Sequence, residues 1–306
     1  MEKTIAIKTS NLTKAFNGNI AVDGLNIEIK KGELFGLVGP DGAGKTTTMR
    51  LLVSIMEPTS GEAWVGGHSV LKEGGRIREK IGYMSQRFGL YEDLSVIENI
   101  NFYADLYEVP GKERPGRTER LLGFSNLTPF KERLAGRLSG GMKQKLGLAC
   151  ALIHTPEVLF LDEPTNGVDP VSRRDFWRIL YDLMKEGVTI FVSTAYLDEA
   201  ERCTRVGLMH KGRLLMDDEP SAIKKRIGLP MIELWSDNGR AAIAVIKGMD
   251  GIKNINAYGN RLHITVIEKD VICRVIDGLD KAGVGIKGYR ETLPSLEDVF
   301  VSMVEH

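Results

Sequence analysis

The chain has 306 residues and a formal net charge of zero, with 41 basic side chains balanced by 41 acidic ones. This balance provides no global field that would attract nucleic acid or anionic lipid, so no nucleic-acid partner is expected. No apolar run approaches the roughly 18 residues that span a bilayer, and a membrane role would therefore come through a partner. The length accommodates one large domain and one smaller domain.

The three cysteines are far apart in the sequence. Cys150, Cys203 and Cys273 have no metal-ligand spacing and lie in apolar surroundings. They are predicted to be reduced core residues of a cytosolic protein.

The first elements predicted along the chain are short strands. Apolar residues favour strands over 5–7, 19–22 and 25–29, and a later hairpin over 61–70 turns at the glycine pair 66–67. Consecutive hairpins of this kind indicate an antiparallel β subdomain.

The most specific motif follows the apolar run 34–38, which predicts a buried strand, and precedes a predicted helix over 47–53. We call it the phosphate loop, and its residues are Gly39, Pro40, Asp41, Gly42, Ala43, Gly44, Lys45, Thr46 and Thr47. They match G-x-x-x-x-G-K-[ST], whose glycines let backbone N–H groups surround phosphate oxygens at a helix N-terminus. Lys45 would contact the β- and γ-phosphates, and the Thr46 hydroxyl would ligate Mg²⁺. The alternative, a glycine-rich turn that binds no ligand, is disfavoured because both the residue pattern and its position between a strand and a helix match the motif.

The pattern becomes helical after the segment that contains Gln86. Apolar residues from about 95 to 155 recur at helical spacing, and a helical subdomain is predicted over about 87–155. The residues assigned to one helix face are Val96, Ile97, Ile100, Phe102, Tyr103 and Leu106.

The run Leu138-Ser139-Gly140-Gly141-Met142 precedes a helix predicted through Leu152. Ser139 alone is typical of a helix N-cap. At this point the chain resembles the ATP-binding-cassette (ABC) ATPases, whose signature is LSGG followed by a polar residue or methionine. The resemblance implies that Ser139, Gly140 and Gly141 cap the γ-phosphate of ATP bound to an opposite subunit, so that two subunits enclose two nucleotides.

A second apolar run, 158–161, predicts a buried strand that ends at Asp162 and Glu163. A carboxylate at this edge would lie beside the phosphate loop, where Asp162 can hold Mg²⁺ through water. Glu163 can accept a proton from the attacking water. The alternative, a solvated acidic turn, is disfavoured by the phosphate loop.

The resemblance assigns three more residues. Gln86 would touch Mg²⁺ or the attacking water and link the site to a membrane partner, although a lone glutamine is usually a surface residue. Asp169, in Gly-Val-Asp-Pro at 167–170, matches the D-loop that crosses the dimer interface. Phe16 fits the aromatic that stacks on adenine, with a plain core residue as the alternative. Together the motifs run from residue 16 to about 200.

The chain departs from the family at two positions. Family members place a histidine in a segment of the form S-T-H, and here Ala195 follows Ser193 and Thr194. In the family this histidine contacts the γ-phosphate and holds the attacking water and the catalytic glutamate, and alanine has no polar group for that task. We therefore expect slow hydrolysis at this site, or pairing with a second cassette that carries the histidine. Asp41 stands where asparagine or serine is more usual, and its charge would repel phosphates modestly unless it faces solvent.

A break near 227–230 precedes a second region. Its order of strand, helix, strand, strand, helix, strand and helix suggests a ferredoxin-like sandwich. The predicted elements are 231–235, 240–247, 252–258, 261–266, 270–282, 284–289 and 295–304. Ser295 can cap the last helix, whose apolar stripe is Leu296, Val299, Phe300 and Met303. This stripe either packs on its own domain or serves dimerisation or regulation.

The predicted fold is therefore an α/β P-loop NTPase. It has a mostly parallel central sheet, an antiparallel β subdomain and a helical subdomain, followed by a small α+β, ferredoxin-like domain. The nucleotide-binding domain is assigned to 1–227 and the accessory domain to 228–306.

Three segments resemble exporters with ABC-2-type permeases: Met142, residues 195–202 and residues 294–300. The resemblance implies an ATPase that cleaves ATP to ADP and phosphate, with ATP and Mg²⁺ bound. It would lie on the cytoplasmic face of the inner or plasma membrane, held by an integral-membrane permease and paired with an identical or different cassette. Tyr91 and the stretch 96–106 are candidate permease contacts. The alternatives are a soluble cassette ATPase acting on the ribosome or DNA, and an ATP-dependent clamp with little turnover.

Overall fold

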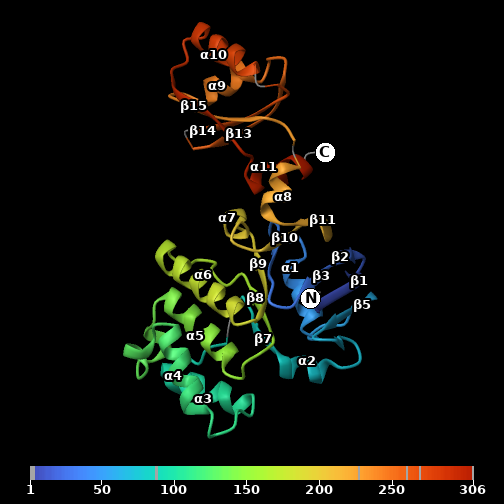
Figure 1. Cartoon of the computed structure of the whole chain (residues 1–306), viewed down its shortest axis with the longest axis vertical. Helices are drawn as coiled ribbons and strands as arrows, with labels where there is room; N and C mark the ends of the chain where they lie inside the picture. Colours follow the sequence, from blue (N-terminus) through green and yellow to red (C-terminus); the bar gives the residue numbers. More distant parts are fainter. Residues whose placement is uncertain (1–3, 87–88, 227, 260, 269, 305–306) are drawn as a thin grey trace. The chain divides into compact units, whose positions relative to one another are not determined.

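The computed structural model describes residues 4–86, 89–226, 228–259, 261–268 and 270–304. It divides the chain into two compact units, Met1–Asp218 and Glu219–His306 (Figure 1). The division falls earlier than the expected boundary at 227, so helix α8 (Pro220–Lys225) belongs to the second unit. Residue 227, and residues 87–88 at the expected start of the helical subdomain, lie outside the described residues.

The first unit is built on a six-stranded sheet. Its strands, in spatial order, are β11 (Arg213–Asp218), β10 (Arg205–His210), β4 (Leu34–Val38), β9 (Thr189–Thr194), β8 (Val158–Asp162) and β7 (Ile81–Met84). All neighbouring pairs are parallel except β11 with β10, which confirms the mostly parallel sheet. Every residue of β4, β8 and β9 is buried, as expected for parallel strands covered on both faces.

The predicted antiparallel subdomain is also present. Its strands are β1 (Ile5–Phe16), β2 (Asn19–Leu25), β3 (Glu28–Lys30), β5 (Ser60–Val65) and β6 (His68–Ser69). Strand β1 pairs with β2, β3 and β5, always antiparallel. It is longer than the predicted 5–7 because polar residues continue it. Buried Thr9, for example, donates its hydroxyl to the Leu25 carbonyl and accepts the Ile27 amide.

Helices surround the central sheet, and three of them form the predicted helical lobe (Figure 1). The lobe consists of α3 (Val96–Leu106), α4 (Arg114–Phe124) and α5 (Gly140–Leu152), with short 3₁₀ turns at Thr128–Phe130 and Ala135–Arg137. The other helices are α1 (Lys45–Leu52), α2 (Gly74–Lys80), α6 (Pro170–Lys185) and α7 (Leu197–Ala200).

The assignment of one apolar face to helix α3 was wrong. Val96 and Ile100 are buried together with Ala104, whereas Phe102 is 37% and Leu106 61% exposed. An α-helix turns about 100° per residue, so positions 102 and 106 share a different face from 96, 100 and 104. Helix α3 therefore has one face in the lobe and a second apolar face exposed in the described chain.

The second unit contains a four-stranded antiparallel sheet with helices α9 (Gly239–Ile246) and α10 (Val271–Lys281) packed around one core. The strands are β12 (Met231–Ser236), β13 (Ile252–Tyr258), β14 (Arg261–Val266) and β15 (Ile286–Thr292). Their spatial order, β13-β14-β12-β15, is that of a ferredoxin-like sandwich and confirms the prediction.

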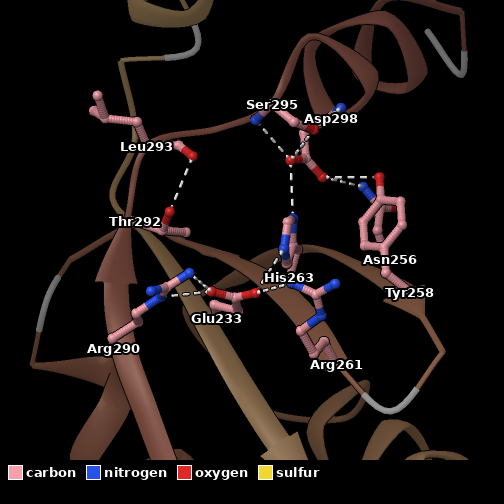
Figure 2. A network of polar contacts seen from close by, with 10 residues as sticks. All are labelled: Glu233, Asn256, Tyr258, Arg261, His263, Arg290, Thr292, Leu293, Ser295 and Asp298. Carbon is pink, nitrogen blue, oxygen red and sulfur yellow. Dashed lines mark hydrogen bonds and ion pairs between the residues drawn. The ribbon is translucent and has the colours of Figure 1, made fainter. Parts of the chain in front are cut away.

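The sheet face opposite this core carries a network of polar side chains (Figure 2). Glu233 pairs with Arg261 at 3.0 Å and with Arg290 at 2.6 Å. Asp298, on helix α11 (Leu296–Val304), accepts hydrogen bonds from the backbone and hydroxyl of Ser295 and contacts His263 Nδ1 at 3.0 Å. One carboxylate therefore caps the last helix and attaches it to the sheet.

Two further expectations concern the membrane and the cysteines. In the described ranges, no helix combines the length and apolar character needed to cross a bilayer. Cys150 and Cys203 are buried, which raises the pKa of both thiols, but Cys273 is exposed, contrary to the expectation. Helix α10 buries Val271, Val275 and Leu279, and position 273 lies off that face.

The pKa of Asp298 leads to a testable prediction. Burial raises this pKa, but hydrogen bonds from Ser295, Asn256 and His263 outweigh burial and hold it below its ordinary value. A carboxylate with a depressed folded-state pKa stabilises the fold above the unfolded pKa, about 3.9, and loses this effect as the pH falls through the folded value. We expect the hydrogen-exchange protection of α11 to fall as the pH drops below about 4.

Asp298→Asn should remove most of this pH dependence and lower the protection of α11 at neutral pH. The matched control is Asp277→Asn on α10, whose exposed side chain leaves the network intact. A protection factor for residues 296–304 that is independent of pH in the native chain would contradict the prediction.

Candidate functional site

The phosphate loop connects the end of β4 to the start of α1 and curls around its own lysine. Lys45 Nζ donates to the carbonyls of Gly39 at 2.8 Å and Pro40 at 3.1 Å. The Lys45 side chain is only 4% exposed. The loop therefore presents its backbone around a buried cation at the N-terminus of α1, an arrangement suited to an anionic ligand.

Two of the loop glycines are required by the close approach of other strands. A Cβ at Gly39 would lie 2.1 Å from the carbonyl oxygen of Met209 on β10. Gly44 has φ +107°, and a Cβ there would lie 2.2 Å from the Ala21 carbonyl oxygen on β2. Only glycine leaves room for these contacts, which hold the loop between the two sheets of the first unit.

Asp162 ends β8 beside the loop. This carboxylate is 1% exposed and accepts hydrogen bonds from the hydroxyls of Thr46 at 3.1 Å and Ser193 at 2.6 Å. Carboxylate and hydroxyl oxygens are the hard ligands that Mg²⁺ prefers. The donor set of Thr46 and Asp162 therefore fits the ion expected from the sequence.

Glu163 lies at the centre of the site. Its Oε1 is 3.2 Å from Lys45 Nζ, and its Oε2 accepts from Gln86 Nε2 at 2.9 Å and Asn166 Nδ2 at 3.3 Å. Its backbone is left-handed, with φ 48°, a strain of about 1–3 kcal/mol for a residue other than glycine. The Glu163 amide donates to Ser193 Oγ at 3.0 Å, which helps to hold this conformation.

The phosphate loop and Glu163 line a cavity of about 510 Å³, which is large enough for a small organic ligand, and Asp162 lies behind Thr46 outside the wall of this cavity. Phe16, Asp41 to Thr47, Gln86 and Glu163, all expected at the site, lie in its wall together with Ala21 and Asn166. Phe16 is 43% exposed, and Lys14 Nζ is 5.2 Å from its ring centroid. Sequence reasoning missed Asn166, although an amide side chain three residues after the candidate base was an available signal.

The signature segment and Asp169 lie outside the residues that line this cavity. Ser139 caps α5 by accepting the Met142 amide at 3.3 Å. A Cβ at Gly141 would lie 2.4 Å from Ser172 Cβ, so the start of α5 packs against the start of α6. Asp169 caps α6, and hydrogen bonds from the hydroxyl and amide of Ser172 lower its pKa.

Ala195 borders a second cavity, of about 270 Å³, on another side of Glu163. Its other lining residues are Asp41, Glu163, Thr165, Asn166, Thr194 and Tyr196. Asp41 is exposed and lines both this cavity and the phosphate-loop cavity. The methyl group of Ala195 presents no hydrogen-bonding atom to this space.

Comparison with known families gives two matches. A family model described as ABC transporter matches residues 22–166. A second, described as the C-terminal domain of DrrA1-3-like ATP-binding proteins, matches residues 219–304.

Curated proteins similar to the chain are ATP-binding proteins of transporters. It is 43% identical to the probable multidrug ABC transporter ATP-binding protein YbhF of Escherichia coli (strain K12), over 97% of this chain and 52% of that protein. It is 34% identical to the bacitracin transport ATP-binding protein BcrA of Bacillus licheniformis, over 97% of each. It is 32% identical to the daunorubicin resistance ATP-binding protein DrrA2 of Streptomyces coeruleorubidus, over 98% of this chain and 95% of that protein. The chain thus spans about half the length of YbhF.

Solved structures share the fold of the first unit. One is cbiO1 of Clostridium perfringens, part of the ABC transporter complex cbiONQ, with 29% identity and a TM-score of 0.67 over 72% of this chain and 91% of that one. Another is a dimeric ATP-binding cassette in a post-hydrolysis state bound to ADP and Pi, with 27% identity and a TM-score of 0.64 over 70% and 98%.

The close approach at Gly39 leads to a prediction. Gly39→Ala forces the loop or β10 to move, and overpacking of this kind costs about 1–3 kcal/mol. We expect the affinity for ATP, measured by isothermal titration calorimetry, to fall about 10-fold or more. The control is Gly75→Ala on α2, where a Cβ meets nothing within 4 Å and affinity should not change. Equal ATP affinity of Gly39→Ala and the native chain would contradict the packing argument.

Proposed function

Since the chain belongs to the ATP-binding proteins of ABC transporters, we propose that it binds and hydrolyses Mg-ATP to drive an ABC-2-type membrane exporter. The observation that carries the proposal is the contact of Glu163 with Lys45 in the wall of the phosphate-loop cavity. The phosphate loop, its lysine and the candidate carboxylate base therefore lie in the wall of one cavity.

The roles follow from the geometry. The backbone of residues 39–47 and Lys45 bind the phosphates, and Phe16 offers its exposed ring to the base. Glu163 takes the proton of the attacking water, with Gln86 holding Oε2 of this carboxylate. Thr46 and Asp162, with Gln86, would hold Mg²⁺, which neutralises charge on the phosphate oxygens when bound.

The site requires a second cassette. Ser139, Gly140 and Gly141 lie at the start of α5 and do not line the described cavity, so they are free to cap the γ-phosphate in another subunit. The Gly141 contact with Ser172 places this helix start beside the D-loop, and Asp169 would meet the partner there. The solved relative described as dimeric supports this arrangement, with an identical or different partner.

The permease would dock on the exposed face of α3. Tyr91 is 46% and Leu106 61% exposed, and Tyr91 packs against Phe102 with ring centroids 4.5 Å apart. Glu92, which follows Tyr91, pairs with Lys143 of α5 at 2.7 Å. A movement of this surface, which would face the permease on the cytoplasmic side of the membrane, would therefore reach the signature helix α5 through the Glu92–Lys143 pair.

One alternative has a specific observation in its favour. Ala195 removes the polar contact expected at the γ-phosphate, which would suit an ATP-dependent clamp with little turnover. An ATPase acting on ribosomes or DNA has no such support, and the neutral charge disfavours it.

Glu163→Gln tests hydrolysis. Removal of a general base lowers turnover by about 10²- to 10⁴-fold, and we expect phosphate release by the full chain to fall by this amount while ATP still binds. Glu132→Gln, at an exposed position of the helical lobe, is the control and should keep native turnover. Equal, near-zero rates for the native chain and Glu163→Gln would favour the clamp.

Leu106→Asp tests docking. A charge on the exposed apolar face of α3 should weaken copurification with a coexpressed ABC-2-type permease by about 10-fold or more. Leu71→Asp, 50% exposed on a different surface, is the matched control. Undiminished copurification of Leu106→Asp would contradict the proposed docking face, and recovery of ribosomes or DNA in place of the permease would favour the alternative partner.

A further inference from the structure

A chain of hydrogen bonds leads from Glu163 to the residue that follows Ala195. Asn166 Nδ2 donates to Glu163 Oε2 at 3.3 Å, and Tyr196 donates its hydroxyl to Asn166 Oδ1 at 3.4 Å. The bond from Tyr196 fixes the orientation of the Asn166 amide, because its oxygen faces the phenol and its nitrogen then faces the carboxylate.

We propose that Tyr196 and Asn166 are positioning residues that hold Glu163 for hydrolysis and take over this part of the task of the missing histidine. The inference rests on the proposed function of the site in ATP hydrolysis. It assigns to Tyr196 no contact with the nucleotide or the attacking water. The tyrosine acts on the base through Asn166.

Two elements hold Tyr196 in place, as a positioning role requires. The Tyr196 amide donates to Thr194 Oγ1 at 3.0 Å at the end of β9. The guanidinium of Arg173, on α6, lies 4.9 Å from the centroid of the Tyr196 ring. A cation over an aromatic face stabilises the ring orientation, here on a side chain that is 39% exposed.

Arg173 is held in turn by Glu199 of α7. Glu199 is fully buried, and its Oε1 is 3.3 Å from Arg173 Nε. Its carboxylate also accepts the hydroxyls of Thr165 at 2.6 Å and Thr194 at 3.0 Å. A buried carboxylate is tolerated only when it is paired and hydrogen-bonded, and these partners come from the segments that precede Asn166 and Tyr196. The same buried group therefore anchors both positioning residues.

The two amides act on one oxygen of the base. Gln86 and Asn166 both donate to Glu163 Oε2, whereas Oε1 is turned toward Lys45. The carboxylate is thus held by two amide hydrogen bonds at Oε2, while Oε1 faces the lysine of the phosphate loop. A histidine at position 195 would enter the neighbouring cavity, whose lining includes Glu163, Asn166 and Tyr196. Such a histidine would hold the base directly and make the tyrosine dispensable.

The experiment is a cycle of substitutions in the full chain, with kcat and KM for ATP measured at saturating Mg²⁺. Tyr196→Phe removes one hydroxyl and keeps the ring under Arg173. We expect kcat to fall about 3- to 10-fold, as expected for one lost hydrogen bond, with KM unchanged. In the Ala195→His background the same substitution should change kcat less than about 2-fold.

Tyr181→Phe on α6 is the matched control. It likewise removes a tyrosine hydroxyl, but one that donates to the backbone carbonyl of Arg202 at 2.9 Å, and it should leave kcat unchanged. Asn166→Ala should lower kcat at least as much as Tyr196→Phe. Thermal melting of each variant separates a loss of rate from a loss of folded protein.

The outcomes distinguish the inference from the proposed function. An unchanged kcat in Tyr196→Phe overturns the inference, as does an equal fold-loss in the Ala195 and Ala195→His backgrounds, or a loss expressed in KM alone. If native turnover does not exceed that of Glu163→Gln, the proposed hydrolysis fails and the inference fails with it.

Discussion

The contact between Lys45 and Glu163 is the constraint on which the site depends. The two charged side chains are 4% and 10% exposed, and their atoms are 3.2 Å apart. The desolvation penalty of a buried pair can exceed its Coulombic gain, so such a pair needs further partners on every side. The Gly39 and Pro40 carbonyls satisfy the lysine, and two side-chain amides satisfy the carboxylate. The phosphate loop thus supplies the partners of the lysine, and residues after two neighbouring strands, β7 and β8, supply those of the carboxylate.

The parallel sheet explains how groups so distant in sequence reach this pair. Strands β4, β9, β8 and β7 are neighbours in that order, and parallel strands end at the same edge. The phosphate loop, Ala195, Glu163 and Gln86 each follow one of these strands. This edge is where α/β sheets bind their ligands. Because β9 lies between β4 and β8, the residue that follows it, Ala195, borders a cavity that is also lined by Asp41 of the phosphate loop and by Glu163.

The second unit also contains buried carboxylates that need charged or hydrogen-bonding partners, and here they stabilise the fold. Glu233 and Asp298 are buried carboxylates on the sheet face opposite the core. Two arginines neutralise Glu233, while hydroxyl, amide and imidazole groups surround Asp298 (Figure 2). Asp298 attaches helix α11 to the sheet, and the apolar stripe of that helix buries Leu296 and Val299. The stability of this helix therefore depends on one ionised side chain as well as on apolar packing.

Much of the molecule follows from the sequence alone. The strand, loop and helix around Gly39–Thr47 and the apolar strand before Asp162 are local patterns. Phosphate binding requires particular residue types at fixed spacing along the chain, so these patterns can be identified without knowledge of the fold. The order of strands and helices in the second unit also predicted its sandwich, because short connections leave few topologies. The long β1 was missed because polar residues continue it through hydrogen bonds to other strands.

Only the tertiary structure decided which residues surround Glu163. Asn166 and Tyr196 belong to different loops, and their contact depends on the side-by-side position of β8 and β9. The second face of α3 and the exposure of Cys273 likewise depend on which side of a helix the core covers. A sequence pattern specifies the chemistry of a motif. The neighbours of that motif are set by strand order and packing, which connect residues that share no local signal.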